Sequence, residues 1–254
     1  MSRTVAILQA RMGSSRLPGK VLIELAGRPM LGWAVERTRR ASCVDAVVVA
    51  TTLDASDDPI EQYCAAQGYA CYRGSAYDVL DRYYQAALGW QAETVVRITA
   101  DCPFIDPQVV DHTVAEFVRS GVDFAANRLP PPWKRTYPIG LDTEVCTFAA
   151  LERAWREARL PHEREHVMPY LYTEPGRFRT LLVNTDPDYG ALRWTVDTPQ
   201  DLALMRQLVS FFPGRDDFSW LDVLAVVQQH PELGQLNAEV HAKVFDDVDQ
   251  RFKK

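Results

Sequence analysis

Residues 10–20, with the sequence ARMGSSRLPGK, combine the side chains that proteins use to bind phosphates. This basic loop holds three cations, Arg11, Arg16 and Lys20, together with two glycines and two serines. Glycines let a loop turn its backbone N–H groups toward an anion, and Arg and Lys add charge and forked hydrogen bonds. Because a nucleoside triphosphate is strongly anionic, the loop predicts a triphosphate-binding site.

The spacing in the basic loop excludes two better-known phosphate-binding motifs. A Walker A motif places four residues between its first glycine and its Gly-Lys pair, and Ser or Thr follows. Here five residues separate Gly13 from Gly19, and Val21 follows the lysine. The dinucleotide-binding pattern GxGxxG is absent as well. The remaining alternative, a solvated surface loop, is disfavoured because the cations cluster in a chain of net charge −6.

Two aspartates follow predicted buried strands and are candidates for a metal site. Asp101 comes after residues 93–99, and Asp197 comes after residues 191–196. The carboxyl ends of parallel strands meet at one edge of an open α/β sheet, where ligands bind. Two carboxylates at this edge suit Mg²⁺, which keeps several waters and bridges to phosphate. The residues alone leave open that each aspartate caps a helix or is a solvated loop acid, since proline follows both closely.

Apolar runs that alternate with amphipathic segments predict the elements that position these residues. Unbroken apolar runs are typical of parallel strands covered on both faces, and their alternation with helices predicts an α/β fold with a doubly wound, mostly parallel sheet. The expected strands are residues 4–10, 45–52, 69–72, 93–99, 122–126, 143–148, 177–184 and 191–196, and the expected helices are residues 29–40, 59–67, 77–90, 107–120, 148–159, 199–212 and 220–229, with a short helix within 163–172.

Composition excludes several other classes of protein. With 47% hydrophobic and 24% charged residues, the 254-residue chain has an ordinary globular composition, and we expect one domain over residues 1–254. Its net charge of −6 disfavours a nucleic acid or an anionic membrane as partner. No apolar run approaches the ~20 residues of a membrane span, so we expect a cytoplasmic protein. The five cysteines show no CxxC spacing, which disfavours disulfides and a zinc site.

The basic loop and its continuation, VLIELAGRPML, resemble the signature of the cytidylyltransferases that make CMP-activated sugar acids. This group includes the CMP-Kdo and CMP-acylneuraminate synthetases. The whole chain is most similar to the SpsF-like branch, which is associated with spore-coat and other surface polysaccharides. The family pattern A-R-x-x-S-x-R-L-P-x-K is matched at every fixed position, by Ala10, Arg11, Ser14, Arg16, Leu17, Pro18 and Lys20.

The resemblance implies a GT-A-like nucleotidyltransferase fold, an α/β/α sandwich. Residues 1–128 would mainly bind the nucleotide, and residues 129–200 would mainly bind the acceptor. The implied reaction is a Mg²⁺-dependent transfer of CMP from CTP to a sugar acid or related small anionic acceptor, with release of pyrophosphate. The family also allows a homodimer. The residues implied in catalysis are Arg11, Arg16, Lys20 and Asp101, and those implied in binding Mg²⁺ are Asp101 and Asp197.

Further nucleotide contacts are expected along the first half of the chain. Ser75 and Arg82 lie in the region where related enzymes recognise the cytosine and the ribose. Arg97 lies within an apolar strand and needs an anionic partner, either the substrate or a structural carboxylate. The full set of expected nucleotide-binding residues is Leu8, Ala10, Arg11, Gly13, Ser14, Arg16, Lys20, Ser75, Arg82, Arg97 and Asp101.

The expected acceptor-binding residues are Asp142, Glu144, Arg164 and His166, in segments similar to those that flank the acceptor pocket of the SpsF-like branch. Asp142 and Glu144 alternate along a predicted strand, so both point to the same face. For the segment around Arg164 and His166, a salt-bridged helix start is the alternative. The acceptor-side motif and dimerisation segment of the Kdo and neuraminate enzymes are missing here, so the identity of the acceptor stays open.

Two other functions are the alternatives to cytidylyl transfer. A sugar-1-phosphate nucleotidylyltransferase using UTP or GTP shares the fold, but it usually opens with a longer GxGxR-type loop, which this chain lacks. A non-catalytic nucleotide-binding regulatory domain would tolerate the loss of Asp101 or Asp197, and this chain has both.

Overall fold

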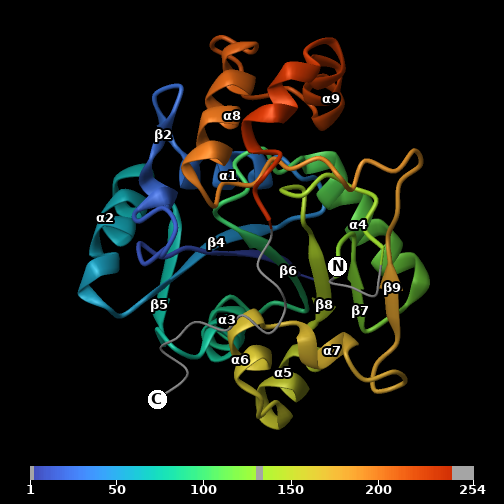
Figure 1. Cartoon of the computed structure of the whole chain (residues 1–254). Helices are drawn as coiled ribbons and strands as arrows, with labels where there is room; N and C mark the ends of the chain where they lie inside the picture. Colours follow the sequence, from blue (N-terminus) through green and yellow to red (C-terminus); the bar gives the residue numbers. More distant parts are fainter. Residues whose placement is uncertain (1–2, 130–133, 242–254) are drawn as a thin grey trace.

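A computed structural model describes residues 3–129 and 134–241 of the chain. Its centre is a seven-stranded sheet in which one strand, Glu144–Thr147, runs antiparallel to both of its neighbours and the other pairs are parallel (Figure 1). The prediction of a mostly parallel sheet is therefore confirmed. The strand order is β5 (Ala70–Gly74), β4 (Ala46–Thr52), β1 (Thr4–Gln9), β6 (Thr94–Thr99), β8 (Glu144–Thr147), β7 (Phe124–Ala126) and β9 (Thr180–Leu182).

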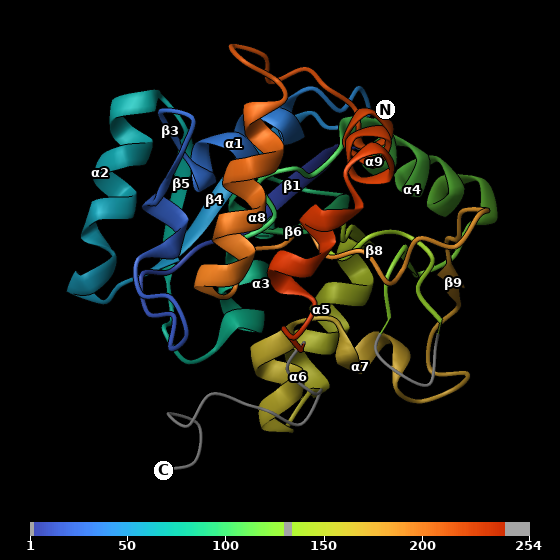
Figure 2. The same ribbon diagram turned by 45° about the horizontal axis from the view of Figure 1, so that its top comes forward.

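Helices cover both faces of the sheet, which confirms the α/β/α sandwich (Figures 1 and 2). Alternate residues of β1 show why its apolar run is unbroken: Val5 and Ile7 pack against one helical layer, and Ala6 and Leu8 pack against the other. No helix in the described part of the chain is long and apolar enough to cross a membrane. One layer consists of α1 (Met30–Arg39), α2 (Asp58–Gln67) and α4 (Pro107–Ser120), and the other of α3 (Val79–Gly89), α5 (Phe148–Glu157) and α7 (Pro169–Tyr172), with α6 (Pro161–His166) beside them.

A third apolar cluster joins the carboxyl-terminal helices to the start of the chain, at the top of Figure 1. Its aromatic centre includes Trp33, Phe104 and Phe218, whose rings lie 5.0–6.3 Å apart. Arg37 is buried beneath it and donates to the carbonyls of three residues, Ile105, Asp216 and Phe218. The elements involved are the hairpin β2 (Glu24–Leu25) and β3 (Arg28–Pro29), with α1, α8 (Pro199–Ser210), α9 (Trp220–Gln229) and the 3-10 helix η3 (Pro231–Asn237).

One predicted strand is wrong. Residues 191–196 begin in a turn and do not join the sheet, in which β1 and β8 occupy the two places next to β6. The segment instead forms an isolated parallel bridge between Ile139 and Arg193, and the N–H of Val196 donates to the carbonyl of Asp101 at 2.9 Å. Its apolar alternation arises because Trp194 and Val196 pack into the third cluster.

Candidate active site

The basic loop leaves β1 and closes on itself around Met12. The carbonyl of Met12 accepts hydrogen bonds from the N–H groups of Ser14 and Gly19, both at 2.9 Å. Gly19 has a φ of 69°, and an added Cβ would lie 3.3 Å from the terminal methyl of Met12. Glycine therefore suits this position, where other residues would be strained. The closed loop leads directly into Lys20, at the start of the 3-10 helix η1 (Lys20–Leu22).

Three more residues predicted to bind the nucleotide lie beside this closure. Leu8 and Ala10 are buried, and the N–H of Ala10 continues the pairing with β4 by donating to the carbonyl of Ala50 at 3.1 Å. Gly13 faces open space, since an added Cβ would have no atom within 4 Å. Leu8 and Ala10 therefore anchor the loop to the sheet, and Gly13 leaves open space next to the loop backbone.

The buried carboxylate of Asp57, outside the basic loop, binds the backbone N–H of Met12. Asp57 is 2% exposed and ends the 3-10 helix η2 (Ala55–Asp57). It accepts the N–H of Met12 at 2.7 Å and the hydroxyl of Thr52. Asp57 was not among the predicted site residues, because the run DASDDP holds three aspartates and no motif distinguishes one of them from the others. The contact makes Asp57 a positioning residue for the basic loop.

Lys20 joins the basic loop to the two aspartates that the sequence singled out. Its Nζ lies 2.7 Å from Oδ2 of Asp101, 2.8 Å from Oδ1 of Asp197 and 2.8 Å from the carbonyl oxygen of Val196. Burial alone would lower the pKa of Lys20, but the two carboxylates outweigh it and raise the pKa above its usual value. Both aspartates therefore converge on one buried ammonium group.

Asp197 is held by two further cations and by a buried acid. Its Oδ2 lies 3.0 Å from Nη2 of Arg16 and accepts a hydrogen bond from Nη2 of Arg193 at 2.7 Å. Burial alone would raise the pKa of Asp197, but Lys20, Arg16 and Arg193 bring it down to about 2, so the carboxylate is ionised at neutral pH. Fully buried Asp201 accepts the N–H of Asp197 and Nε of Arg193, both at 2.9 Å, and so orients both residues.

The two converging carboxylates fit a hard divalent cation that completes its ligand shell from a substrate. The side chains of Asp101 and Asp197 are 24% and 23% exposed, so both carboxylates reach solvent. Among the described residues, no group of three or more His, Cys, Asp and Glu side chains could hold a metal. Mg²⁺ commonly binds one or two carboxylates and takes its other ligands from water and substrate phosphates. A cation here would therefore need a bound phosphate or water as its further ligands.

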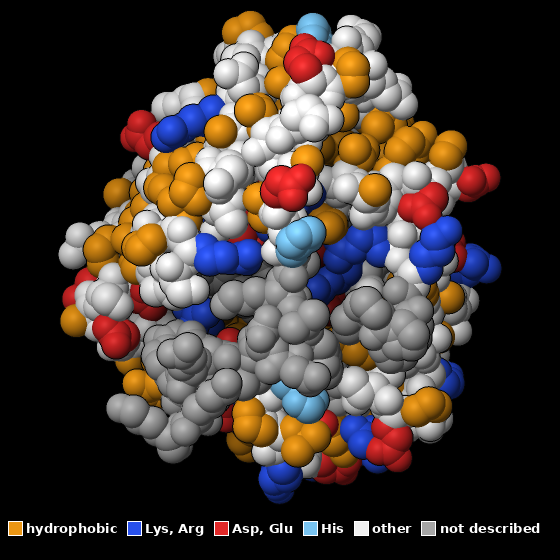
Figure 3. Space-filling view, viewed as in Figure 1, with side chains coloured by type: hydrophobic (Ala, Val, Ile, Leu, Met, Phe, Trp, Pro, Cys, Tyr) orange, Lys and Arg blue, Asp and Glu red, His pale blue; other side chains and the backbone are white. Residues whose placement is uncertain are grey.

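Basic side chains gather on the face of the molecule seen in Figure 3. Several Lys and Arg side chains lie around the middle of this face, below α8 and above α3 in the orientation of Figure 1. The chain as a whole carries a net charge of −6. A local concentration of positive charge on an acidic protein attracts anionic ligands to that face.

A second group of predicted residues meets at the amino-terminal end of α3. The side-chain oxygen of Ser75 accepts the N–H of Asp78 at 2.9 Å, and its carbonyl accepts Nη1 of Arg82 at 3.1 Å. Arg164 forms an ion pair with Asp78 and donates to the carbonyl of Trp155 at 2.7 Å. The structure thus brings Arg164, predicted to bind the acceptor, next to two residues predicted to bind the nucleotide.

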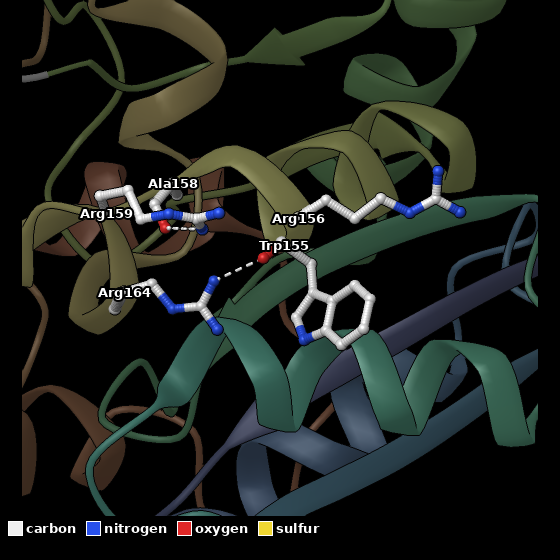
Figure 4. Close-up of a pocket in the computed structure, with 5 residues that line it drawn as sticks. All are labelled: Trp155, Arg156, Ala158, Arg159 and Arg164. Carbon is white, nitrogen blue, oxygen red and sulfur yellow. Dashed lines mark hydrogen bonds between the residues drawn. The ribbon is translucent and has the colours of Figure 1, made fainter.

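Arg164 also borders a cavity of about 590 Å³ at the end of α5 (Figure 4). Arg159 also lines the cavity, lies near Arg164 in Figure 4, and donates to the carbonyl of Ala158 at 3.1 Å. His166 ends α6, the short helix that carries Arg164. The residues that line the cavity are Trp155, Arg156, Ala158, Arg159 and Arg164, so its wall is basic.

Arg97 has a partner within the protein. It forms an ion pair with Glu144 from β6 to β8, with the two side chains 9% and 5% exposed, and it donates to Oε1 of Gln9 at 3.1 Å. The sequence left open whether the anionic partner of Arg97 is the substrate or a structural carboxylate. The structure shows a structural carboxylate, that of Glu144. Glu144, predicted to bind the acceptor, is the partner in this pair, and Asp142 pairs with Arg135 at 2.9 Å.

The chain is similar to known proteins over most of its length. Residues 5–238 match the family model described as Cytidylyltransferase. The chain is 30% identical to the spore coat polysaccharide biosynthesis protein SpsF of Bacillus subtilis (strain 168), over 91% of this chain and 97% of that protein. It is 33% identical to a solved cytidylyltransferase from Leptospira borgpetersenii serovar Hardjo-bovis (strain JB197), with a TM-score of 0.86 over 92% of this chain and 97% of that one.

The fold extends to a more distant solved enzyme, CMP:2-keto-3-deoxy-manno-octonic acid synthetase complexed with CTP. The TM-score is 0.63 at 21% identity, over 83% of this chain and 100% of that one. This likeness confirms the nucleotidyltransferase fold that the family resemblance implied. The family match over residues 5–238 and the relatives that are 30% and 33% identical show that the chain belongs to the cytidylyltransferase family of nucleotidyltransferases.

Proposed function

We propose that this cytidylyltransferase transfers CMP from CTP to a small anionic acceptor, such as a sugar acid, and releases pyrophosphate. The observation that carries the proposal is the convergence of the basic loop with Asp101 and Asp197 through Lys20. The relatives support the substrate classes, because one is named for spore coat polysaccharide biosynthesis and another was solved with CTP. We therefore expect a sugar acid used for surface polysaccharide as the acceptor.

The reaction needs positioning and charge more than it needs a nucleophilic side chain. An acceptor oxygen attacks the α-phosphorus of CTP in line, the bond from that phosphorus to the bridging oxygen breaks, pyrophosphate leaves, and the acceptor's hydroxyl proton passes to water. Arg11, Arg16 and Lys20 would hold the triphosphate and offset the negative charge that builds on the α-phosphate. Electrostatic stabilisation of this kind is usually the largest contribution in phosphoryl and nucleotidyl transfer.

Asp101 and Asp197 would hold Mg²⁺ in this reaction. When bound, Mg²⁺ would offset phosphate charge and lower the pKa of the acceptor hydroxyl. Arg193 would keep the Asp197 carboxylate ionised through its hydrogen bond to Oδ2, and Asp201 would hold the backbone of Asp197 in place by accepting its N–H. The residues around the aspartates thus act mainly by fixing the position of charge.

Pyrophosphate release tests the proposed function. The wild-type enzyme is incubated with Mg²⁺, one of CTP, UTP, GTP or ATP, and a panel of sugar acids and sugar 1-phosphates. We expect release with CTP and at least one sugar acid. Release only with UTP or GTP and a sugar 1-phosphate would contradict the proposal in favour of the other enzyme class. Tight CTP binding without release on any acceptor would favour a regulatory domain.

Asp57→Asn should weaken the binding of CTP, although Asp57 is placed to touch the loop and not the nucleotide. The change replaces a charge-assisted hydrogen bond to the N–H of Met12 by a weaker neutral one, so the basic loop loses part of its anchor. We expect the KM for CTP to rise about tenfold, with a smaller change in kcat, which steady-state kinetics can separate.

The neighbouring aspartate provides the matched control for this prediction. Asp58 is 46% exposed and pairs with Arg73 at 2.7 Å. Asp58→Asn should therefore leave the KM for CTP unchanged. Equal KM values for the Asp57→Asn variant and the wild type would show that the contact with Met12 does not position the loop.

A further inference from the structure

Around the two aspartates, three cations face three carboxylates, so these six groups carry no net charge. Carboxylates attract a free divalent cation through their negative charge. Cations that already lie beside the carboxylates cancel this attraction. Here the arginines and the lysine already supply the compensation at 2.7–3.0 Å. The cations are Arg16, Lys20 and Arg193, and the carboxylates are Asp101, Asp197 and Asp201.

Lys20 fills the position between the two aspartates. An ammonium group has three N–H donors, and Nζ of Lys20 has three acceptors at 2.7, 2.8 and 2.8 Å, on Asp101, Val196 and Asp197. The residue is only 8% exposed, so water screens its charge weakly. A metal ion bound by both carboxylates would lie within a few ångström of this ammonium and would be strongly repelled. Metal and ammonium cannot share the position.

We propose that Lys20 keeps the metal position closed in the nucleotide-free enzyme and that the arriving triphosphate opens it. Phosphate oxygens offer the ammonium the same charge-assisted hydrogen bonds that the aspartates provide. The flexible four-carbon stem of lysine lets the ammonium move to them without a change of the backbone. Asp101 and Asp197 then become free for the cation that accompanies the nucleotide. The inference rests on the proposed function for its nucleotide, and it makes cation and nucleotide bind together.

Binding of Mn²⁺ without nucleotide tests this proposal directly. Electron paramagnetic resonance measures free Mn²⁺ in titrations of the wild type and of Lys20→Gln. We expect at least about tenfold tighter Mn²⁺ binding by Lys20→Gln, because the variant lacks the competing charge. Lys20→Arg keeps the charge and should bind no more tightly than the wild type. The double variant Lys20→Gln, Asp101→Asn should lose the gain, which places the bound ion between the aspartates.

A second measurement on the wild type alone keeps the test independent of how the variants fold. The unfolding temperature is recorded with Mn²⁺ alone, with CTP and EDTA, and with CTP and Mn²⁺. We expect no shift with Mn²⁺ alone and the largest upward shift with both ligands. Equal Mn²⁺ affinity of wild type and Lys20→Gln, or stabilisation of the wild type by Mn²⁺ alone, would overturn the proposal.

Failure of this inference can be told apart from failure of the proposed function. An enzyme that releases pyrophosphate from CTP but binds Mn²⁺ tightly without nucleotide would retain its function and lack the closed position. If Lys20 excludes Mn²⁺ but the enzyme transfers no CMP to any acceptor, the proposed function fails and the inference about Lys20 holds.

Discussion

Replacing Asp101 by asparagine should abolish CMP transfer and leave the fold intact. The side chain is 24% exposed, and the backbone contacts of Asp101 with Thr195 and Val196 do not depend on the carboxylate. Asparagine keeps the shape but removes the charge that faces Lys20 and that would hold the metal. We expect kcat to fall by at least about a thousandfold. Pyrophosphate release at saturating CTP and Mg²⁺ measures the loss, and circular dichroism checks the fold.

Asp123 offers a matched control for this variant. Its side chain is 28% exposed and pairs with Arg179 at 3.0 Å at the start of β7, so it resembles Asp101 in exposure and pairing but lies outside the candidate site. Asp123→Asn should keep full activity. An Asp101→Asn enzyme whose kcat stays within about tenfold of the wild type would rule out a central role for this carboxylate.

The convergence of Lys20 with Asp197, across 177 residues of sequence, could be predicted from general rules. A cationic loop after the first buried strand and an acid after a later extended segment both belong at the carboxyl edge of a parallel sheet. Asp197 lies at this edge, as the rule predicts, even though residues 191–196 do not join the sheet. The reason is that the segment still ends beside β6, where Val196 pairs with the backbone of Asp101.

The residues that support the site were harder to predict because their roles depend on tertiary contacts. Asp57 contacts Met12 from 45 residues away, and nothing in its own segment distinguishes it from the acids around it. Asp201 did leave a signal, since Thr198 and Asp201 form a capping box at the start of α8. The hairpin of β2 and β3 has two residues in each strand, too few to show any alternation.

For the residues predicted to bind the acceptor, the sequence pattern does not determine whether each one contacts the acceptor or another residue of the chain. Three of the residues predicted to bind the acceptor form ion pairs within the chain. A charged group in a partly buried place needs a partner, and the chain supplies one where it folds against itself. An acceptor that uses any of these groups has to exchange an existing ion pair. The pairs are Asp142 with Arg135, Glu144 with Arg97 and Arg164 with Asp78.

Glu144→Ala should destabilise the protein strongly, because it leaves the buried charge of Arg97 without its carboxylate. Burial alone would lower the pKa of Arg97, but Glu144 outweighs it and raises the pKa above its usual value. Losing one partner of a buried ion pair typically costs about 3–5 kcal/mol of unfolding free energy. For a chain of this length we expect the unfolding temperature to fall by about 10 °C, as measured by calorimetry.

A variant that removes both charges distinguishes two causes of the expected loss of stability, the unpaired charge of Arg97 and the lost packing of Glu144. In Arg97→Met, Glu144→Leu, apolar side chains replace the pair, so neither of its two charges remains. Such replacements are often neutral or stabilising, so the double variant should unfold at a higher temperature than Glu144→Ala. Equal losses in the two variants would mean that Glu144 matters for packing alone. The double variant would also show whether this strand pairing needs the ion pair, because Glu144 is the first residue of β8 and pairs in register with Arg97.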